Sequence, residues 1–260
     1  MDHLRLHNYA DRYSHVHLTR DDGVLTVRLH TDDGPLHWGG VPHEELGWCF
    51  ADIAADPENE VVVITGTGES FCAHFYAGEA TSRPAAEWDR VHAEGKRLLL
   101  NLLDIPVPTI AAVNGPATVH AEIAVLCDVV LASDDCVFQD APHYPSGIVP
   151  GDGVHVVWPM LLGPNRGRSF LLTGESLGAR EAQALGVVKE VLPRTELMPR
   201  ALELARSIAA RPPLTRRYAR EVLTQPIKRR LLDELSHGLA LEGLAGGDSW
   251  PAGHRVSPPA

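Results

Sequence analysis

Three short apolar runs constrain the fold of this chain more than any other feature. They cover residues 61–65, 109–113 and 128–132. Each run is apolar at nearly every position, as strands are when both faces of their sheet are buried. Longer patterns with helical spacing, at 42–55 and 85–103, precede the first and the second run. Strands that alternate with helices predict an α/β fold with largely parallel pairing.

A hairpin is expected near the beginning of the chain. Residues 16–20 and 24–30 alternate apolar and polar side chains, and Asp22-Gly23 lies between them. An Asp-Gly pair between two such runs is a strong short-range signal for a β-hairpin. The predicted order therefore opens with two strands, a helix and a third strand.

The C-terminal part of the chain has a different pattern. After residue 163 the pattern is helical except for a short strand at 189–192, and two helical segments are expected between 212 and 247, split near Pro226. We divide the chain into a core at 1–200 that carries the functional site, a helical oligomerisation region at 201–248, and a disordered tail at 249–260.

Composition argues against several classes of protein. The formal net charge of -11 disfavours a nucleic-acid partner or an anionic membrane surface. No apolar run approaches the ~20 residues of a membrane helix, and the first residues lack the pattern of a signal peptide. The four cysteines show no metal-binding spacing, so we expect a reducing, cytoplasmic location and no metal site.

The densest group of candidate functional residues lies in the loop at 138–153. Its prolines restrict the backbone and its glycines permit positive φ, so the loop should fold back and bring His143 near Asp152. A histidine can take and return a proton near neutral pH, and a carboxylate on its other ring nitrogen would fix its tautomer. Taken alone, such a pair is more often a surface histidine and an ordinary turn aspartate.

Three further residues are candidates from their local context. His120 follows a Gly-Pro turn at the expected start of a helix, where its ring could donate to a developing oxyanion. Glu242 follows Leu239 by three positions and so shares its apolar helix face, where a carboxylate needs a partner. Trp38 could donate its indole N–H to a carbonyl. The plainer alternatives are a polar residue near a helix end, a structural salt bridge and a packing tryptophan.

Several segments resemble the crotonase (enoyl-CoA hydratase/isomerase) superfamily. The resemblance is carried by residues 63–73, 108–116, 127–132, 147–153 and 172–186, which follow the order of that family along most of the chain. It implies an oxyanion hole that stabilises an enolate. It also implies an α/β fold: a crotonase-like spiral of ββα repeats with a helical C-terminal trimerisation region.

Departures from the CoA-dependent members point to a narrower group. Ala73 is followed by His74 where those enzymes typically continue with Gly-x-Asp, and His143 stands where a hydratase has a glutamate. The chain is similar instead to 6-oxocamphor hydrolase and related β-diketone hydrolases. The residues that match functional positions of that group are Trp38, His120, His143, Asp152 and Glu242. Glu122 matches the other catalytic glutamate of hydratases, and we interpret it as structural or secondary.

This resemblance implies a cofactor-independent hydrolase that cleaves a C–C bond of a cyclic or bicyclic, non-CoA β-diketone and gives a keto acid. In such a reaction His143, oriented by Asp152, would activate water. The substrate's carbonyl oxygens would be held by His120 and Trp38, and Glu242 would orient His120 or the substrate. The expected partners are the diketone and other copies of the chain, in a homotrimer or a dimer of trimers.

Two other functions remain open. A CoA-thioester crotonase with altered acid and base groups is supported by Glu122 and by the superfamily resemblance. A non-catalytic scaffold that retains the fold is the third possibility. A cysteine hydrolase is not favoured, because Cys72 and His74 lack the third group that would orient them.

Overall fold

The computed structural model describes residues 4–76 and 84–249. Its main sheet has six strands in the order β1-β2-β4-β6-β7-β10, and every neighbouring pair is parallel except the β1–β2 hairpin. Two small sheets, β3–β5 and β8–β9, accompany it. The α/β class with largely parallel pairing is confirmed.

The elements have the following bounds. The strands are β1 (Val16–Asp21), β2 (Val24–Leu29), β3 (His37–Trp38), β4 (Val61–Thr65), β5 (His74–Phe75), β6 (Thr109–Val113), β7 (Val129–Ser133), β8 (Val137–Phe138), β9 (Leu177–Gly178) and β10 (Glu190–Leu192). The helices are α1 (Leu6–Tyr9), α2 (Gly40–Ala55), α3 (Ala85–Asp104), α4 (Glu122–Val125), α5 (Val154–Leu162), α6 (Pro164–Thr173), α7 (Ala179–Ala184), α8 (Arg194–Ala209) and α9 (Pro213–Ser249), with the 3-10 turn η1 (Tyr144–Ser146).

The main sheet is buried on both faces, which explains its apolar strands. On β4, Val61 and Val63 face a smaller cluster that includes Leu197 of α8. Val62 and Ile64, on the alternate positions, belong to the larger core. Because successive side chains point to opposite faces, a strand covered on both sides must be apolar throughout. The bounds predicted for β4 and β6 agree with the structure for the same reason.

The hairpin between β1 and β2 also forms as predicted. Asp22 and Gly23 have φ angles of 45° and 77°. Two successive residues with positive φ are what a type I′ turn requires, and Asp-Gly adopts them at low cost. The pairing of Asp21 with Val24 closes this turn.

The expected break near Pro226 is wrong, because α9 is one continuous helix from Pro213 to Ser249. A proline inside a helix removes one backbone hydrogen bond and tends to kink or end it. Here the helix is anchored on both sides of the proline. Arg220 and Thr224 are buried before it, and Leu231 and Leu235 are buried after it. Tertiary packing therefore outweighs the local preference.

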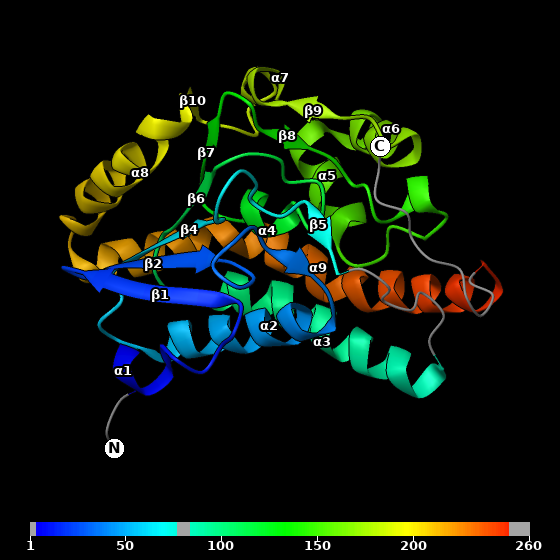
Figure 1. The fold of residues 1–260 in the computed structure, drawn as a ribbon, viewed down its shortest axis with the longest axis horizontal. Helices are drawn as coiled ribbons and strands as arrows, with labels where there is room; N and C mark the ends of the chain where they lie inside the picture. The colour runs from blue at the N-terminus through cyan, green and yellow to red at the C-terminus, as the bar shows by residue number, and fades with distance from the viewer. Residues whose placement is uncertain (1–3, 77–83, 250–260) are drawn as a thin grey trace.

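Helix α9 runs along the long axis of the molecule and packs against α3 and α5 (Figure 1). Leu231, Leu235 and Leu239 belong to the main core. The C-terminal helical region therefore contributes to the core of its own chain. The proposed tail lies outside the described residues, except for Ser249, which ends α9.

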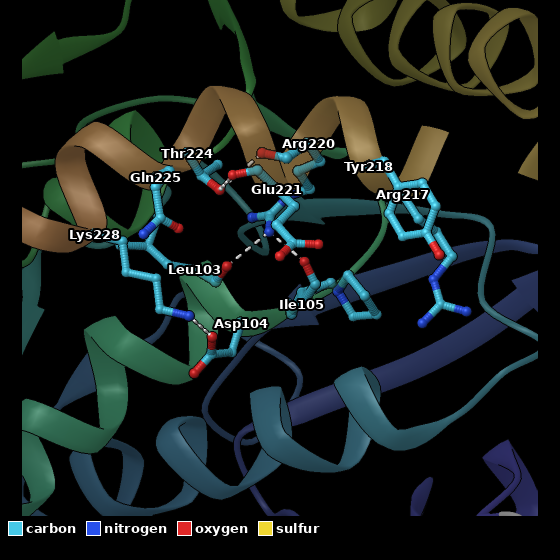
Figure 2. A pocket seen from close by; sticks show the side chains of 11 residues that line it. Leu103, Asp104, Ile105, Arg217, Tyr218, Arg220, Glu221, Thr224, Gln225 and Lys228 are labelled. Carbon is cyan, nitrogen blue, oxygen red and sulfur yellow. Dashed lines mark hydrogen bonds and ion pairs between the residues drawn. The ribbon is translucent and has the colours of Figure 1, made fainter. Parts of the chain in front are cut away.

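Buried Arg220 joins α9 to the end of α3. Its guanidinium donates to the carbonyl oxygens of Leu102, Leu103 and Ile105, and it pairs with Asp128 at 2.8 Å. Figure 2 shows the bonds from Arg220 to the carbonyl oxygens of Leu103 and Ile105 among the residues that line a pocket of about 190 Å³, where Lys228 also pairs with Asp104. The last carbonyls of a helix lack partners within the helix, so a cation there satisfies them and complements the helix dipole.

No helix among the described residues is long and apolar enough to cross a membrane. The four cysteines are all free and buried.

The N-terminal half of α9 exposes an apolar surface. Leu214, Tyr218 and Val222 follow one another at helical spacing and are 60%, 59% and 71% exposed, and Leu223 lies beside them. They line a hollow of about 650 Å³. Contiguous apolar surface of this kind marks interaction sites. We propose that other copies of this chain cover it, in a trimer.

Replacing Val222 and Leu223 together by glutamate should therefore reduce the mass of the assembly, since buried unpaired charges would oppose association. Light scattering after size-exclusion chromatography gives the mass. Leu172→Glu, on the exposed face of α6, serves as the control and should leave the mass unchanged. A wild-type protein that is monomeric at micromolar concentration would contradict the proposal.

Candidate active site

The loop between β8 and α5 packs directly on α9. A Cβ atom at Gly151 would lie 2.3 Å from the carbonyl oxygen of Gly238 and 2.8 Å from Cβ of Glu242. Gly151 is therefore needed for close approach, whereas positive φ occurs at Gly147 and Gly153, at 80° and 111°. The two glycines beside Asp152 let this loop bring the carboxylate against the helix that carries Glu242.

The structure brings all five sequence-predicted residues into one continuous group. Ring centroids of Trp38 and His120 are 4.0 Å apart. Asp152 Oδ2 lies 3.4 Å from His120 Nδ1 and 3.4 Å from His143 Nε2. Glu242 Oε1 lies 3.9 Å from His143 Nε2. Segments that are far apart in the sequence thus converge on two imidazoles.

His143 has carboxylates on both ring nitrogens. Its Nδ1 lies 2.5 Å from Asp140 Oδ1, and its Nε2 faces Asp152 and Glu242. Burial opposes a charge on this ring, but Asp140 and Asp152 outweigh it and raise the pKa of His143 well above its ordinary value. Asp152 lies beside one ring nitrogen of His143, as expected, but the other nitrogen, which was expected to face water, is held by Asp140.

His120 lies in a left-handed backbone conformation, with φ of 46°. Non-glycine residues rarely adopt this region, and such strain is concentrated at functional sites. Its Nδ1 lies 2.5 Å from Glu122 Oε1. Burial lowers the pKa of His120, but the charge of Glu122 and its hydrogen bond reverse this effect, so the net pKa is raised. Glu122 thus pairs with a site histidine.

Glu242 lies on the apolar face of α9, as expected, but the histidine beside it is not His120, which was one of the two partners expected of it. The structure puts it beside His143, and the carboxylate that contacts His120 is Glu122. Burial raises the pKa of Glu242 to about 8, although the nearby His143 opposes the shift. Burial thus favours the neutral form of Glu242, which can donate a hydrogen bond.

A third histidine, which the sequence did not single out, borders the site. His43, on α2, has its ring 6.0 Å from that of His120 and packs edge-on against Trp38. Its Nδ1 lies 3.0 Å from Glu94 Oε2 of α3. Burial lowers the pKa of His43, although the hydrogen bond to Glu94 opposes the shift. Neither His43 nor Asp140 lies in a motif, and only the i, i+3 spacing of Asp140 and His143 hinted at a contact.

Two groups of described residues hold three potential metal ligands within 4.8 Å of one another. One is His120, Glu122 and Asp152, inside the site. The other is His17, His30 and Asp33 at the surface, where the Asp33 amide donates to His30 Nδ1 and occupies its lone pair. The side chains of the buried group are of types that can bind a small divalent cation. The hydrogen bond between His120 and Glu122 would compete with the binding of such a cation.

Cys72 is fully buried, and burial raises the pKa of its thiol. A thiol held neutral in this way is a poor nucleophile. This agrees with the sequence argument against a cysteine hydrolase.

Comparison with known proteins places the chain in a family. The Enoyl-CoA hydratase/isomerase family model matches residues 42–241. Carnitinyl-CoA dehydratase of Proteus mirabilis is 34% identical over 209 residues, which cover 80% of this chain and 79% of that protein. The same enzyme of Escherichia coli is 32% identical over 212 residues, with the same coverage. The chain therefore belongs to the enoyl-CoA hydratase/isomerase, or crotonase, family.

Solved structures show a more specific likeness. A β-diketone hydrolase from the cyanobacterium Anabaena sp. PCC 7120, bound to (S)-3-oxocyclohexyl acetic acid, superposes with a TM-score of 0.89. It is 47% identical and covers 92% of this chain and 97% of its own. An enoyl-CoA hydratase/isomerase from Mycobacterium paratuberculosis shares the fold with a TM-score of 0.83, at 24% identity and with 90% of this chain and 94% of its own covered. The expected crotonase fold is thereby confirmed.

The contact of Glu122 with His120 can be tested without substrate. In Glu122→Gln the carboxylate that raises the pKa of His120 is lost, so that pKa should fall. A histidine NMR titration measures it. Glu45→Gln, which alters a carboxylate that contacts His15 instead, should leave the His120 titration unchanged. An unchanged His120 titration in Glu122→Gln would show that the two side chains are not paired in solution.

Proposed function

We propose that this member of the crotonase family is a hydrolase that cleaves a C–C bond of a cyclic or bicyclic β-diketone that carries no CoA. One observation carries the proposal: buried His143 and largely buried His120, each paired with its own carboxylate, are joined through Asp152. Such a group can activate water at one histidine and hold developing negative charge at the other. The likeness to a β-diketone hydrolase supports it.

His143 is the base in this proposal. Its neutral form takes a proton from water at Nε2 as the water oxygen bonds to one carbonyl carbon, giving a tetrahedral intermediate. Asp152, 3.4 Å from Nε2, stabilises the imidazolium that results. The C–C bond to the central carbon then breaks, and its electron pair moves onto that carbon and the second carbonyl as an enolate. The attacked carbon becomes the carboxylic acid group of the product.

The second carbonyl stabilises the carbanion that forms when the C–C bond breaks, so the reaction requires a 1,3-diketone. His120, protonated and held by Glu122, would donate to the carbonyl oxygen where charge develops. Trp38 packs on the ring of His120 and would border the position of that carbonyl oxygen. The proton taken by His143 returns to the central carbon, directly or through Glu242 at 3.9 Å, and completes the keto acid. Substrate plus water equals product.

The ligand of the Anabaena structure has the composition that this reaction predicts for a product. A ring ketone with an acetic acid side chain results when water opens a bicyclic 1,3-diketone. The alternative is a reaction on a CoA thioester. The similarity of this chain to proteins named carnitinyl-CoA dehydratase favours that alternative. Against it, Glu122, which matches a hydratase glutamate, is bound to His120 at 2.5 Å.

We therefore expect turnover of the bicyclic 1,3-diketone whose ring opening gives 3-oxocyclohexyl acetic acid, and none of crotonyl-CoA or carnitinyl-CoA. Loss of the diketone absorbance and formation of the CoA product are followed in parallel assays. His143→Ala provides the background for each assay. Hydration or dehydration of a thioester by the wild-type protein, without diketone cleavage, would establish the alternative.

The pH dependence follows from the raised pKa of His143. Since the base must be neutral, kcat/KM should rise with pH through an apparent pKa above the ordinary histidine value. Asp152→Asn removes a charge that raises this pKa, so the rise should shift to lower pH. Loss of the charge that stabilises the imidazolium should also lower kcat by about 10²- to 10⁴-fold, with less effect on KM.

Asp134→Asn, at an exposed position after β7, is the matched control and should behave as wild type. An Asp152→Asn variant with wild-type kcat would remove Asp152 from the mechanism.

A further inference from the structure

A carboxylate that plays no part in the sequence argument lies on the far side of His143. Asp140 precedes His143 by three residues, and its Oδ1 is 2.5 Å from His143 Nδ1. Both side chains are almost fully buried, at 3% and 5% exposed. The contact is the shortest that His143 makes, and it leaves only Nε2 to face the other site residues.

Asp140 has no other described partner. Its second oxygen, Oδ2, is buried and makes no hydrogen bond within the described part of the chain. The equally buried Asp56, by contrast, accepts from Tyr9, Arg20 and the Glu58 amide and joins three segments. Burying a carboxylate is costly unless partners compensate it. A residue kept only for the fold would be expected to resemble Asp56, whereas Asp140 is compensated by His143 alone.

We propose that Asp140 is the positioning residue of His143: it accepts the Nδ1 proton and so leaves the Nε2 lone pair as the base. This inference rests on the proposed function, in which His143 activates water. It assigns the orienting role to Asp140 and leaves Asp152 beside the reacting nitrogen, 3.4 Å from both imidazoles. A carboxylate on the nitrogen remote from the reaction is the arrangement that fixes a catalytic histidine in a triad.

Four groups face His143 and influence its charge. Asp140 precedes η1, Asp152 precedes α5, Glu242 comes from α9, and His120 precedes α4. Asp140 and Asp152 come from opposite ends of the loop between β8 and α5, Glu242 comes from α9, and only Asp140 contacts Nδ1. A change at Asp140 should therefore remove the acceptor that favours a proton on Nδ1, whereas a change at Asp152 or Glu242 acts on His143 through Nε2.

The test compares the wild-type protein, Asp140→Asn and Asp140→Ala. Imidazole ¹⁵N NMR, assigned with His143→Gln, reads the tautomer and titration of His143 without substrate. The neutral wild-type ring should carry its proton on Nδ1. Both variants should lower the pKa of His143 and lose the Nδ1–H preference. In the diketone assay they should lower kcat by about 10²- to 10⁴-fold with little change in KM, and shift the rise of kcat/KM to lower pH.

Asp56→Asn controls for the loss of a buried carboxylate. It should reduce thermal stability and leave both the His143 spectrum and kcat unchanged. A wild-type ring protonated on Nε2 would overturn the inference even if no variant folds. Wild-type titration and kcat in a folded Asp140→Asn protein would overturn it as well. If no diketone is cleaved but the His143 spectrum responds to Asp140, the proposed function fails while the assignment of Asp140 to His143 stands.

Discussion

The candidate site depends on the mutual compensation of buried charges. Glu122, Asp140, Asp152 and Glu242 are all at least nine-tenths buried, and two imidazoles lie among them. Isolated carboxylates at such depth would each carry a large desolvation cost, which only close cations or protonation can remove. The pKa shifts follow from this: both histidines are raised toward the charged form, and Glu242 is raised toward the neutral form. Removing any one partner therefore changes the charge of the others.

The scaffold serves this group by bringing separate segments to one place. Trp38 comes from β3, His120 from the turn before α4, and His143 and Asp152 from the loop between β8 and α5. Glu242 arrives on α9, whose leucines anchor it in the core and whose Gly238 lets the Gly151 backbone approach closely. Because one long helix both closes the core and supplies a site carboxylate, the stability of the C-terminal region and the chemistry of the site are linked.

Much of this arrangement could be predicted from the sequence, for identifiable reasons. β4 and β6 were predictable because burial on both faces demands apolar side chains, and the β1–β2 turn because Asp-Gly adopts positive φ. The path of α9 through Pro226 was not, since it depends on contacts with distant segments. The five site residues could be proposed from the family resemblance. The pairing of their ring nitrogens with carboxylates could not be predicted, because it depends on small differences in the positions of these groups. His43 carries no signal in a single sequence, and Asp140 is indicated only by its i, i+3 spacing from His143.

The central claim is that water, activated at His143, adds to a carbonyl and becomes part of a carboxylate as a C–C bond breaks. A single turnover of a bicyclic 1,3-diketone in H₂¹⁸O measures this most directly. The account predicts one ¹⁸O atom in the new carboxylate, after correction for carbonyl exchange without enzyme, and one solvent hydrogen on the carbon that left. A product whose carboxylate carries no label above that correction would contradict it.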